Sequence, residues 1–228
     1  MIDFKKHELE IDGITHVYYP ATKKKKYLVI TFAAMSGIYN RVEQFYKEGM
    51  WYNTSYLFLA DKPPYTWYVS GYENILKFYC DQFEKENIIM LGSSMGSFGA
   101  MWHGFSISAG IVMAIAPASP SLSFGESNLL WEELQILMIK CKNLPILYME
   151  ATGFPPDHTM FRTISSHYIN AGGKMVFETN PKNNQHVAMK MGTANHFFST
   201  AKYLIGWRSQ ESSIDDFTAS SKDELMIL

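Results

Sequence analysis

A serine flanked by two glycines is the feature of this chain with the clearest chemistry. Ser94 is the centre of the run Gly92, Ser93, Ser94, Met95, Gly96, which fits the pattern G-x-S-x-G. The four residues before this run are apolar, as in a buried strand, and apolar residues at helical spacing follow it. Such a strand-to-helix turn exposes the serine hydroxyl and aims helix N–H groups at an oxyanion. We predict that Ser94 is a nucleophile, that the Met95 N–H is an oxyanion donor, and that Ser93 supports the turn.

A serine hydroxyl becomes a strong nucleophile when an imidazole takes its proton and a carboxylate holds that imidazole. Asp157 is the preferred acid, because it ends a turn-rich loop, residues 151–157, that follows a predicted strand. An aspartate in front of a helix is also a common N-cap. Glu150, at the end of the strand itself, is the alternative acid.

Two histidines compete for the role of the base. His186 ends the polar loop 180–186 after the last predicted strand, and the chain between Asp157 and His186 has room for one helix, one strand and a loop. His196 stands among apolar residues on a predicted helix, where a partly buried structural histidine is the more frequent case. We therefore favour His186 as the base.

The chain alternates short apolar runs with longer segments of helical spacing, which indicates a parallel sheet with crossover helices. An Asp12-Gly13 turn between two short runs predicts an N-terminal antiparallel hairpin. The fold class is therefore α/β, a mostly parallel central sheet with helices on both faces. The predicted strands are 27–33, 55–60, 88–91, 110–116, 145–149 and 174–178, and the predicted helices are 41–47, 73–86, 97–105, 129–140, 159–170 and 193–207.

The turn around Ser94 resembles the nucleophile elbow of the α/β-hydrolase superfamily. The resemblance is carried by residues 91–96 with Phe98, Gly99 and Ala100, and it extends over residues 27–207. It implies a serine, an acid and a histidine in chain order, with the last two on loops after the two final strands, and a minimal cap. Residues 117–127 read as a loop before a helix that could act as a small lid.

The same resemblance implies a second oxyanion donor in the turn after the first core strand. Ala34 is the first choice for this donor and Met35 the second. Many family members carry a His-Gly pair at this turn, where this chain has Phe32 and Ala33.

An aromatic loop, residues 62–68, follows the second core strand at the edge where open α/β sheets bind ligands. We predict that Tyr65, Trp67 and Tyr68 bind substrate, although such a cluster is as often a packed loop anchor. The strand ending at Ala34, with a short and almost capless body, is similar to small α/β-hydrolase-type O-acetyltransferases and esterases of bacterial surface polysaccharides. That similarity implies a small-molecule or carbohydrate ester as substrate.

Three function classes fit these residues. The first is a serine esterase that cleaves an acyl or acetyl ester through an acyl-enzyme at Ser94. The second is an O-acyltransferase in which a sugar hydroxyl intercepts that acyl-enzyme, and the third is a non-catalytic binding protein on the same fold. Because the sequence has no phosphate-binding loop, no dinucleotide motif and no H-E-x-x-H spacing, we expect no cofactor and no metal.

Composition bounds the remaining possibilities. At 228 residues with 47% hydrophobic residues, the chain has material for one domain, which we assign to residues 1–207, followed by a polar tail, 208–228, that we expect to be mobile. A net charge of -2 does not favour a nucleic-acid partner. The N-terminus lacks a signal-peptide pattern, and no apolar run is long enough for a membrane span. Only Cys80 and Cys141 are present, which favours a reducing, cytoplasmic setting.

Overall fold

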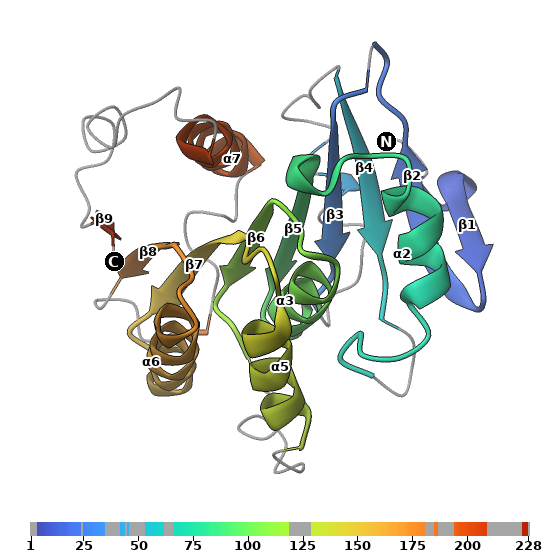
Figure 1. Cartoon of the computed structure of the whole chain (residues 1–228). Coiled ribbons are helices and arrows are strands. Elements are labelled where there is room, and N and C mark those ends of the chain that lie inside the picture. Colours follow the sequence, from blue (N-terminus) through green and yellow to red (C-terminus); the bar gives the residue numbers. More distant parts are fainter. Residues whose placement is uncertain are drawn as a thin grey trace.

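The strands form one sheet (Figure 1). The computed structural model describes residues 4–23, 25–34, 42–43, 45, 53–61, 66–118, 129–180, 185–186, 194–208 and 225–227. Within these residues the sheet has nine strands in the order β1-β2-β4-β3-β5-β6-β7-β8-β9. The strands are β1 (Glu8–Ile11), β2 (Ile14–Tyr19), β3 (Tyr27–Phe32), β4 (Thr54–Leu59), β5 (Ile88–Ser93), β6 (Ile111–Ile115), β7 (Ile146–Thr152), β8 (Met175–Asn180) and β9 (Leu225–Ile227).

The six central strands, β4-β3-β5-β6-β7-β8, are all parallel, and these are the six strands that the sequence predicts. Strands β7 and β8 run further than expected, to Thr152 and Asn180. The predicted N-terminal hairpin is also present, because β1 pairs antiparallel with β2 around Asp12 and Gly13, both at positive φ. β2 then pairs antiparallel with β4. The predicted fold class is confirmed.

The main helices are α2 (Glu73–Cys80), α3 (Met95–Ile107), α5 (Leu129–Lys140), α6 (Pro155–Asn170) and α7 (Ala194–Arg208). Short 3₁₀ helices cover Phe4–His7 and Lys85–Asn87. The predicted helix 73–86 ends earlier, at Cys80, and Glu84 beyond it is extended. α6 begins earlier than expected, at two prolines whose fixed φ suits the first turn of a helix.

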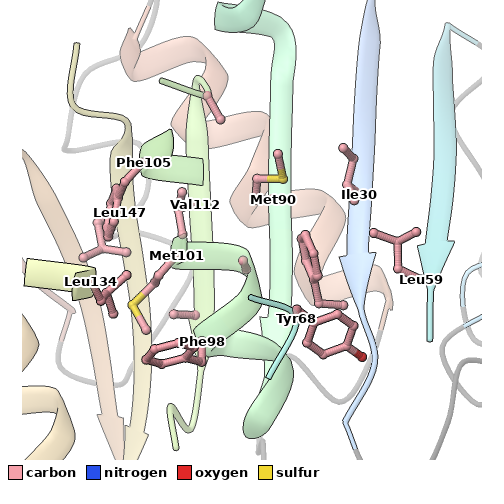
Figure 2. Packing of buried hydrophobic residues seen from close by; sticks show 14 of the residues in the cluster. Ile30, Leu59, Tyr68, Met90, Phe98, Met101, Phe105, Val112, Leu134 and Leu147 are labelled. Atoms are coloured by element: carbon pink, nitrogen blue, oxygen red, sulfur yellow. The ribbon is translucent and has the colours of Figure 1, made fainter. Parts of the chain in front are cut away.

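Helices cover both faces of the sheet, and each face has its own core. α2, α3, α5 and α6 pack on one face, where Phe98, Met101 and Phe105 of α3 contact strand residues such as Met90 and Val112 (Figure 2). α7 packs on the opposite face with Phe197, Phe198, Ala201, Tyr203 and Leu204. Strands β3, β4 and β6 are buried along their whole length, as strands covered on both faces must be.

Part of the predicted tail belongs to the sheet. Arg208 ends α7 and donates from Nη1 to the Gly110 carbonyl oxygen at 2.6 Å. Leu225–Ile227 form β9, which pairs antiparallel with β8 at the edge of the sheet, and the mobility of residues 208–228 stays a prediction. Residues 209–224, and residues 119–128 of the predicted lid loop, lie outside the described residues. No helix in the described part of the chain is long and apolar enough to cross a membrane.

Candidate active site

Ser94 stands at a strained turn between β5 and α3. Its backbone angles are φ 53 and ψ -124, a conformation that residues other than glycine rarely adopt. The turn is tied to the next strand, because the Ser94 N–H donates to the Ile115 carbonyl at 2.9 Å and the Ala118 N–H donates to the Ser94 carbonyl at 3.3 Å. These hydrogen bonds keep Ser94 in its strained backbone conformation, as is typical of functional turns.

Glycines flank Ser94 because backbones meet there. A Cβ atom at Gly92 would lie 2.0 Å from the Gly96 carbonyl oxygen, and one at Gly96 would lie 2.2 Å from the Phe32 carbonyl oxygen. Both distances are far inside van der Waals contact. The G-x-S-x-G pattern is thus required by the packing of α3 against β5 and β3.

Ser97 braces the same turn and was not singled out from the sequence. Its buried hydroxyl lies 3.0 Å from the Gly92 carbonyl oxygen and 2.9 Å from the Ile115 carbonyl oxygen, and it accepts from the Ile115 N–H at 3.0 Å. One side chain therefore links β5, β6 and the first turn of α3. Its signal in the sequence is only a polar residue in the first turn of a mostly apolar helix.

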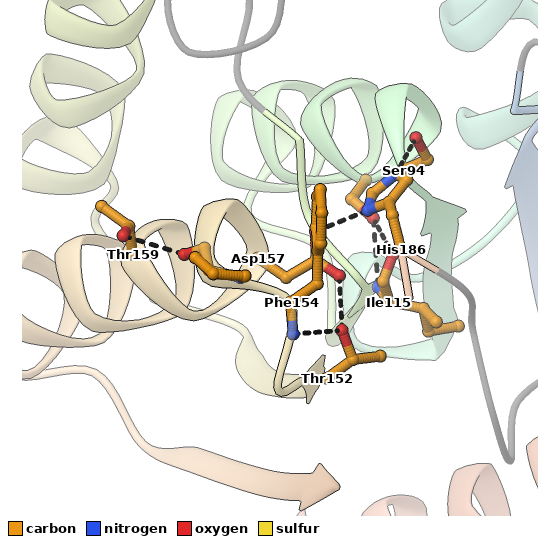
Figure 3. Close-up of polar contacts among 9 residues, drawn as sticks. Ser94, Ile115, Thr152, Phe154, Asp157, Thr159 and His186 are labelled. Atoms are coloured by element: carbon orange, nitrogen blue, oxygen red, sulfur yellow. Dashed lines mark hydrogen bonds and ion pairs between the residues drawn. The ribbon is translucent and has the colours of Figure 1, made fainter. Parts of the chain in front are cut away.

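The structure brings Ser94, His186 and Asp157 together (Figure 3). His186 Nε2 lies 2.7 Å from Ser94 Oγ, and His186 Nδ1 lies 2.5 Å from Asp157 Oδ1. Because a carboxylate can only accept, Nδ1 carries the proton and Nε2 accepts from the serine hydroxyl. The hydrogen bond from Asp157 raises the pKa of His186 above its ordinary value, against the lowering effect of partial burial.

Asp157 occupies the first turn of α6, and its side chain is 1% exposed. The N-cap of α6 is Phe154, so Asp157 is free of the capping role that the sequence left open. Thr152, at the end of β7, donates from Oγ1 to Asp157 Oδ2 at 2.9 Å and accepts from the Phe154 N–H at 3.2 Å. Thr152 orients the carboxylate, and the sequence analysis missed it.

The alternative residues lie around a different carboxylate. His196, on α7, has its Nε2 3.6 Å from Glu178 Oε1. Glu150, on β7, is buried and is the register partner of Glu178 on β8. The preferred pair makes the contacts instead: His186 hydrogen-bonds to Ser94 Oγ, and Asp157 hydrogen-bonds to the imidazole of His186.

The two predicted oxyanion donors lie on adjoining segments. Met95 is the first residue of α3, and the first N–H groups of a helix have no partner within the helix. Ala34 follows β3, and the carbonyl oxygen of the preceding Ala33 would be 2.9 Å from a Cβ at Gly96, so this peptide packs against the first turn of α3. Met35 lies outside the described residues.

The predicted aromatic substrate site is corrected by burial. Trp67 is 3% exposed and Tyr68 is 0% exposed, so a bound substrate would not reach either side chain. They anchor their loop instead, with Trp67 against Phe98 and Tyr68 against Phe32 in edge-to-face contacts. Tyr65 lies outside the described residues.

A cavity of about 800 Å³ opens elsewhere, between α2 and α3. Leu76, Trp102 and His103 are among its lining residues, and Ser94 is not. Within the part of the chain that the structure describes, no group of three or more His, Cys, Asp or Glu side chains could hold a metal ion.

No protein-family model and no curated protein sequence matches this chain. Its structure, however, is similar to several solved ones. The capsule O-acetyltransferase of Neisseria meningitidis serogroup A superposes with a TM-score of 0.64 at 16% identity, over 87% of this chain and 93% of that one. A hormone-sensitive lipase from a metagenome library gives 0.56 at 14% identity, over 90% and 85% of the two chains. The esterase LipW from Mycobacterium marinum gives 0.55 at 11% identity, over 84% and 76%. The chain therefore has the α/β-hydrolase fold.

Proposed function

We propose that this protein is a serine esterase that cleaves a carboxylic ester through an acyl-enzyme at Ser94. The observation that carries the proposal is the chain of hydrogen bonds from Ser94 Oγ to His186 and from His186 to Asp157. A hydroxyl bonded to a neutral imidazole, which is itself bonded to a buried carboxylate, is the arrangement that activates a serine. Likeness in fold to a lipase and an esterase adds support.

In the first half of the reaction, Ser94 Oγ bonds to the acyl carbon while its proton moves to His186 Nε2. Asp157 stabilises the resulting imidazolium through the Nδ1–H bond. The carbonyl oxygen becomes an oxyanion, which the N–H groups of Met95 and Ala34 stabilise. When the tetrahedral intermediate collapses, the alcohol leaves with the proton from Nε2. Water then repeats the sequence on the acyl-enzyme and releases the acid, so the cycle needs no cofactor.

A second candidate is O-acyl transfer, in which a sugar hydroxyl takes the place of water. The likeness in fold to the capsule O-acetyltransferase of Neisseria meningitidis favours testing it, and one structure of that enzyme is a complex with CoA. The same three residues would serve both reactions, because only the acceptor of the acyl group differs. The third alternative, a non-catalytic binding protein, predicts no turnover at all.

The proposal is tested by labelling the purified protein with a fluorophosphonate and by measuring hydrolysis of p-nitrophenyl acetate. The wild type should react at one serine and turn over the ester, and Ser94→Ala should lose both properties. Ser93→Ala is the matched control, because it removes the neighbouring hydroxyl and should keep labelling. Equal labelling of the wild type and Ser94→Ala, or no turnover by the wild type, would overturn the proposal.

Acyl transfer is tested in the same assay with acetyl-CoA or p-nitrophenyl acetate as donor and neutral or acidic sugars as acceptors. If an acceptor raises the rate of donor consumption and an O-acetylated sugar appears, transfer replaces hydrolysis as the main activity. If donor consumption does not change over the acceptor series, the esterase proposal stands.

We also propose that residues 1–207 form one domain and that the protein works in the reducing setting of the cytoplasm. Strands β1 to β8, all within residues 1–207, lie in one continuous sheet, which supports the first proposal, and β9 adds an edge strand to it. The two cysteines, Cys80 and Cys141, are both free thiols, which supports the second. Ester turnover should therefore be unchanged in buffers that contain a strong thiol reductant.

A further inference from the structure

The hydroxyl of Tyr68 is a buried donor with a specific acceptor next to the candidate site. It donates to the Ala33 carbonyl oxygen at 2.6 Å, and the residue has no exposed surface. Burial raises the pKa of the Tyr68 phenol well above its ordinary value. The hydroxyl is therefore protonated, and so a donor, at neutral pH.

The bond to Ala33 also determines where the next N–H points. The Ala33 carbonyl and the Ala34 N–H belong to one rigid trans peptide, in which the two groups point in opposite directions. A donor that holds the carbonyl in place therefore holds the N–H in place. The same bond polarises the peptide, which makes the N–H a better donor to an anion.

The loop that presents Tyr68 is strained. Trp67 and Tyr68 have φ values of 55 and 63, a left-handed conformation that bulky side chains rarely adopt. Asp61 holds this conformation, because its Oδ2 accepts from the Thr66 N–H at 2.9 Å and from the Trp67 N–H at 3.0 Å. Strain of this kind persists only where the surroundings enforce it, and it clusters at functional sites.

The backbone and ring of Tyr68 are held from α3 as well. His103 is buried, and burial lowers its pKa to about 4, so the neutral ring donates from Nε2 to the Tyr68 carbonyl oxygen at 2.6 Å. The ring of Tyr68 lies directly on the backbone of α3, since a Cβ at Gly99 would be 2.7 Å from Tyr68 Cβ. Figure 2 shows Tyr68 between α3 and the strand that carries Ile30. Every part of Tyr68 thus has a fixed position relative to the helix that follows Ser94.

We propose that Tyr68 is a positioning residue for the oxyanion site, which acts by holding the Ala33 carbonyl and so aiming the Ala34 N–H. Tyr68 itself does not touch the substrate. The inference rests on the proposed function, because an oxyanion forms only when Ser94 attacks an acyl carbon. The proposal gives a role to the aromatic loop after β4. Ser94, Asp157 and His186 follow other strands, β5, β7 and β8.

Tyr68→Phe tests the proposal, because it removes the hydroxyl and keeps the ring. The matched control is Tyr168→Phe: Tyr168 is equally buried, and its hydroxyl also donates to a backbone carbonyl, that of Pro145 at the opposite end of β7. For Tyr68→Phe we expect kcat to fall roughly 10- to 100-fold while KM changes less than about twofold, since oxyanion contacts act in the transition state. Affinity for a trifluoromethyl ketone, which forms an oxyanion on Ser94, should fall by the same factor as kcat. Tyr168→Phe should leave both within about twofold of the wild type.

A second variant keeps the test informative if Tyr68→Phe does not fold. Gly99→Ala pushes the ring of Tyr68 away from α3 while keeping its hydroxyl, so it should show the same joint loss of kcat and ketone affinity. Suppose that Tyr68→Phe and Gly99→Ala keep the kcat and the ketone affinity of Tyr168→Phe, while Ser94→Ala is inactive. That result would overturn this inference and leave the proposed function intact. A wild type that neither labels nor hydrolyses esters would overturn both.

Discussion

The carboxylate of Asp157 has a separate partner for each oxygen. Oδ1 accepts from His186 and Oδ2 accepts from Thr152, in a position that solvent hardly reaches. A buried carboxylate with a fixed donor on each oxygen keeps one orientation, which is what an imidazole needs to hold its tautomer. At the scale of single residues, the candidate site is therefore a chain of four side chains, Ser94, His186, Asp157 and Thr152, in which each contacts the next.

The first prediction concerns pH. Asp157 raises the pKa of His186, and the reaction needs the neutral imidazole, so kcat/KM should fall on the acid side through an apparent pKa above the usual 6.5 of histidine. In Asp157→Asn the plateau should fall by about 10⁴-fold, and the acid limb should move to lower pH because the raising charge is gone. Esterase rates between pH 5 and 9 measure both. An unshifted acid limb would show that Asp157 does not control the base.

The raised pKa of His186 also affects the stability of the fold, and there it favours low pH, whereas the reaction favours high pH. A histidine whose pKa is raised by folding stabilises the folded state below the usual pKa, and this contribution is lost as the pH rises through the raised value. The His186 side chain is 33% exposed, so solvent screens the pair and weakens the effect. Acidic conditions therefore favour the ion pair but not the reaction.

The second prediction tests the orienting role of Thr152. Thr152→Val removes a donor to Asp157 Oδ2 and leaves the Phe154 N–H without its acceptor. We expect the free energy of unfolding to fall by about 1–3 kcal/mol, and kcat/KM to fall about 10- to 100-fold as the carboxylate loses its orientation. Thr159→Val is the control, since the Thr159 hydroxyl donates to the Pro155 carbonyl on an exposed face of α6. For the control, urea unfolding should show a change in unfolding free energy within about 0.5 kcal/mol, and ester kinetics should show an equally small change in the activation free energy.

At the scale of elements, the parallel sheet collects the candidate residues at one edge. Parallel strands end on the same side, so the segments after β3, β5, β7 and β8 bring Ala34, Ser94, Asp157 and His186 to a common edge. The connection between β5 and α3 has the tightest steric requirements. There the first turn of α3 packs against the backbone at the end of β3 with no space for a side chain.

The third prediction therefore contrasts two glycines. Gly96→Ala places a Cβ 2.2 Å from the Phe32 carbonyl oxygen, so we expect a loss of about 3 kcal/mol in unfolding free energy and a large loss of kcat. Gly172→Ala adds a Cβ with nothing within 4 Å, at φ +85, and should cost only about 1 kcal/mol through its backbone conformation. Urea midpoints give the comparison. Equal costs for the two variants would mean that α3 can move away from β3.

At the scale of the whole molecule, the two cores on opposite faces of the sheet have different parts in the site. The larger core supports α3, which begins next to Ser94, and α6, which carries Asp157. The smaller core is built on α7, the next described helix after His186. Since both cores share every central strand, we expect them to unfold together.

The fourth prediction follows from that shared sheet. Phe98→Ala in the larger core and Phe197→Ala in the smaller one each remove a fully buried ring, so each should lower the free energy of unfolding by about 3–5 kcal/mol. Phe78→Ala, at a side chain that is 59% exposed, should change it by less than about 0.5 kcal/mol. Unfolding curves from near- and far-ultraviolet circular dichroism should coincide for both core variants. Separate transitions would indicate that the two faces unfold independently.

Features that depend on neighbours along the chain could be predicted from the sequence. The apolar runs of β3, β5 and β7, the Asp12-Gly13 turn and the small residues around Ser94 all act within a few residues, where steric and hydrogen-bonding preferences are local. The order of Ser94, Asp157 and His186 on successive loops is what the resemblance to the α/β-hydrolase superfamily implies. The sequence alone therefore predicted the fold class and offered Ser94, Asp157 and His186 as candidates, with Glu150 and His196 as alternatives.

Other features depend on residues that meet only after folding. Tyr68 could equally have lined a pocket or packed beneath it, and the structure buries it because α3 offers a glycine where the ring lies. The support of Asp157 by Thr152, the bracing of the turn by Ser97 and the pairing of β9 with β8 join different strands and helices. Side-chain partners of this kind are decided by register and packing across the sheet, which no local pattern encodes. The sequence thus predicted Ser94, Asp157 and His186 as the candidate residues, and the tertiary structure decided which residues hold them in place.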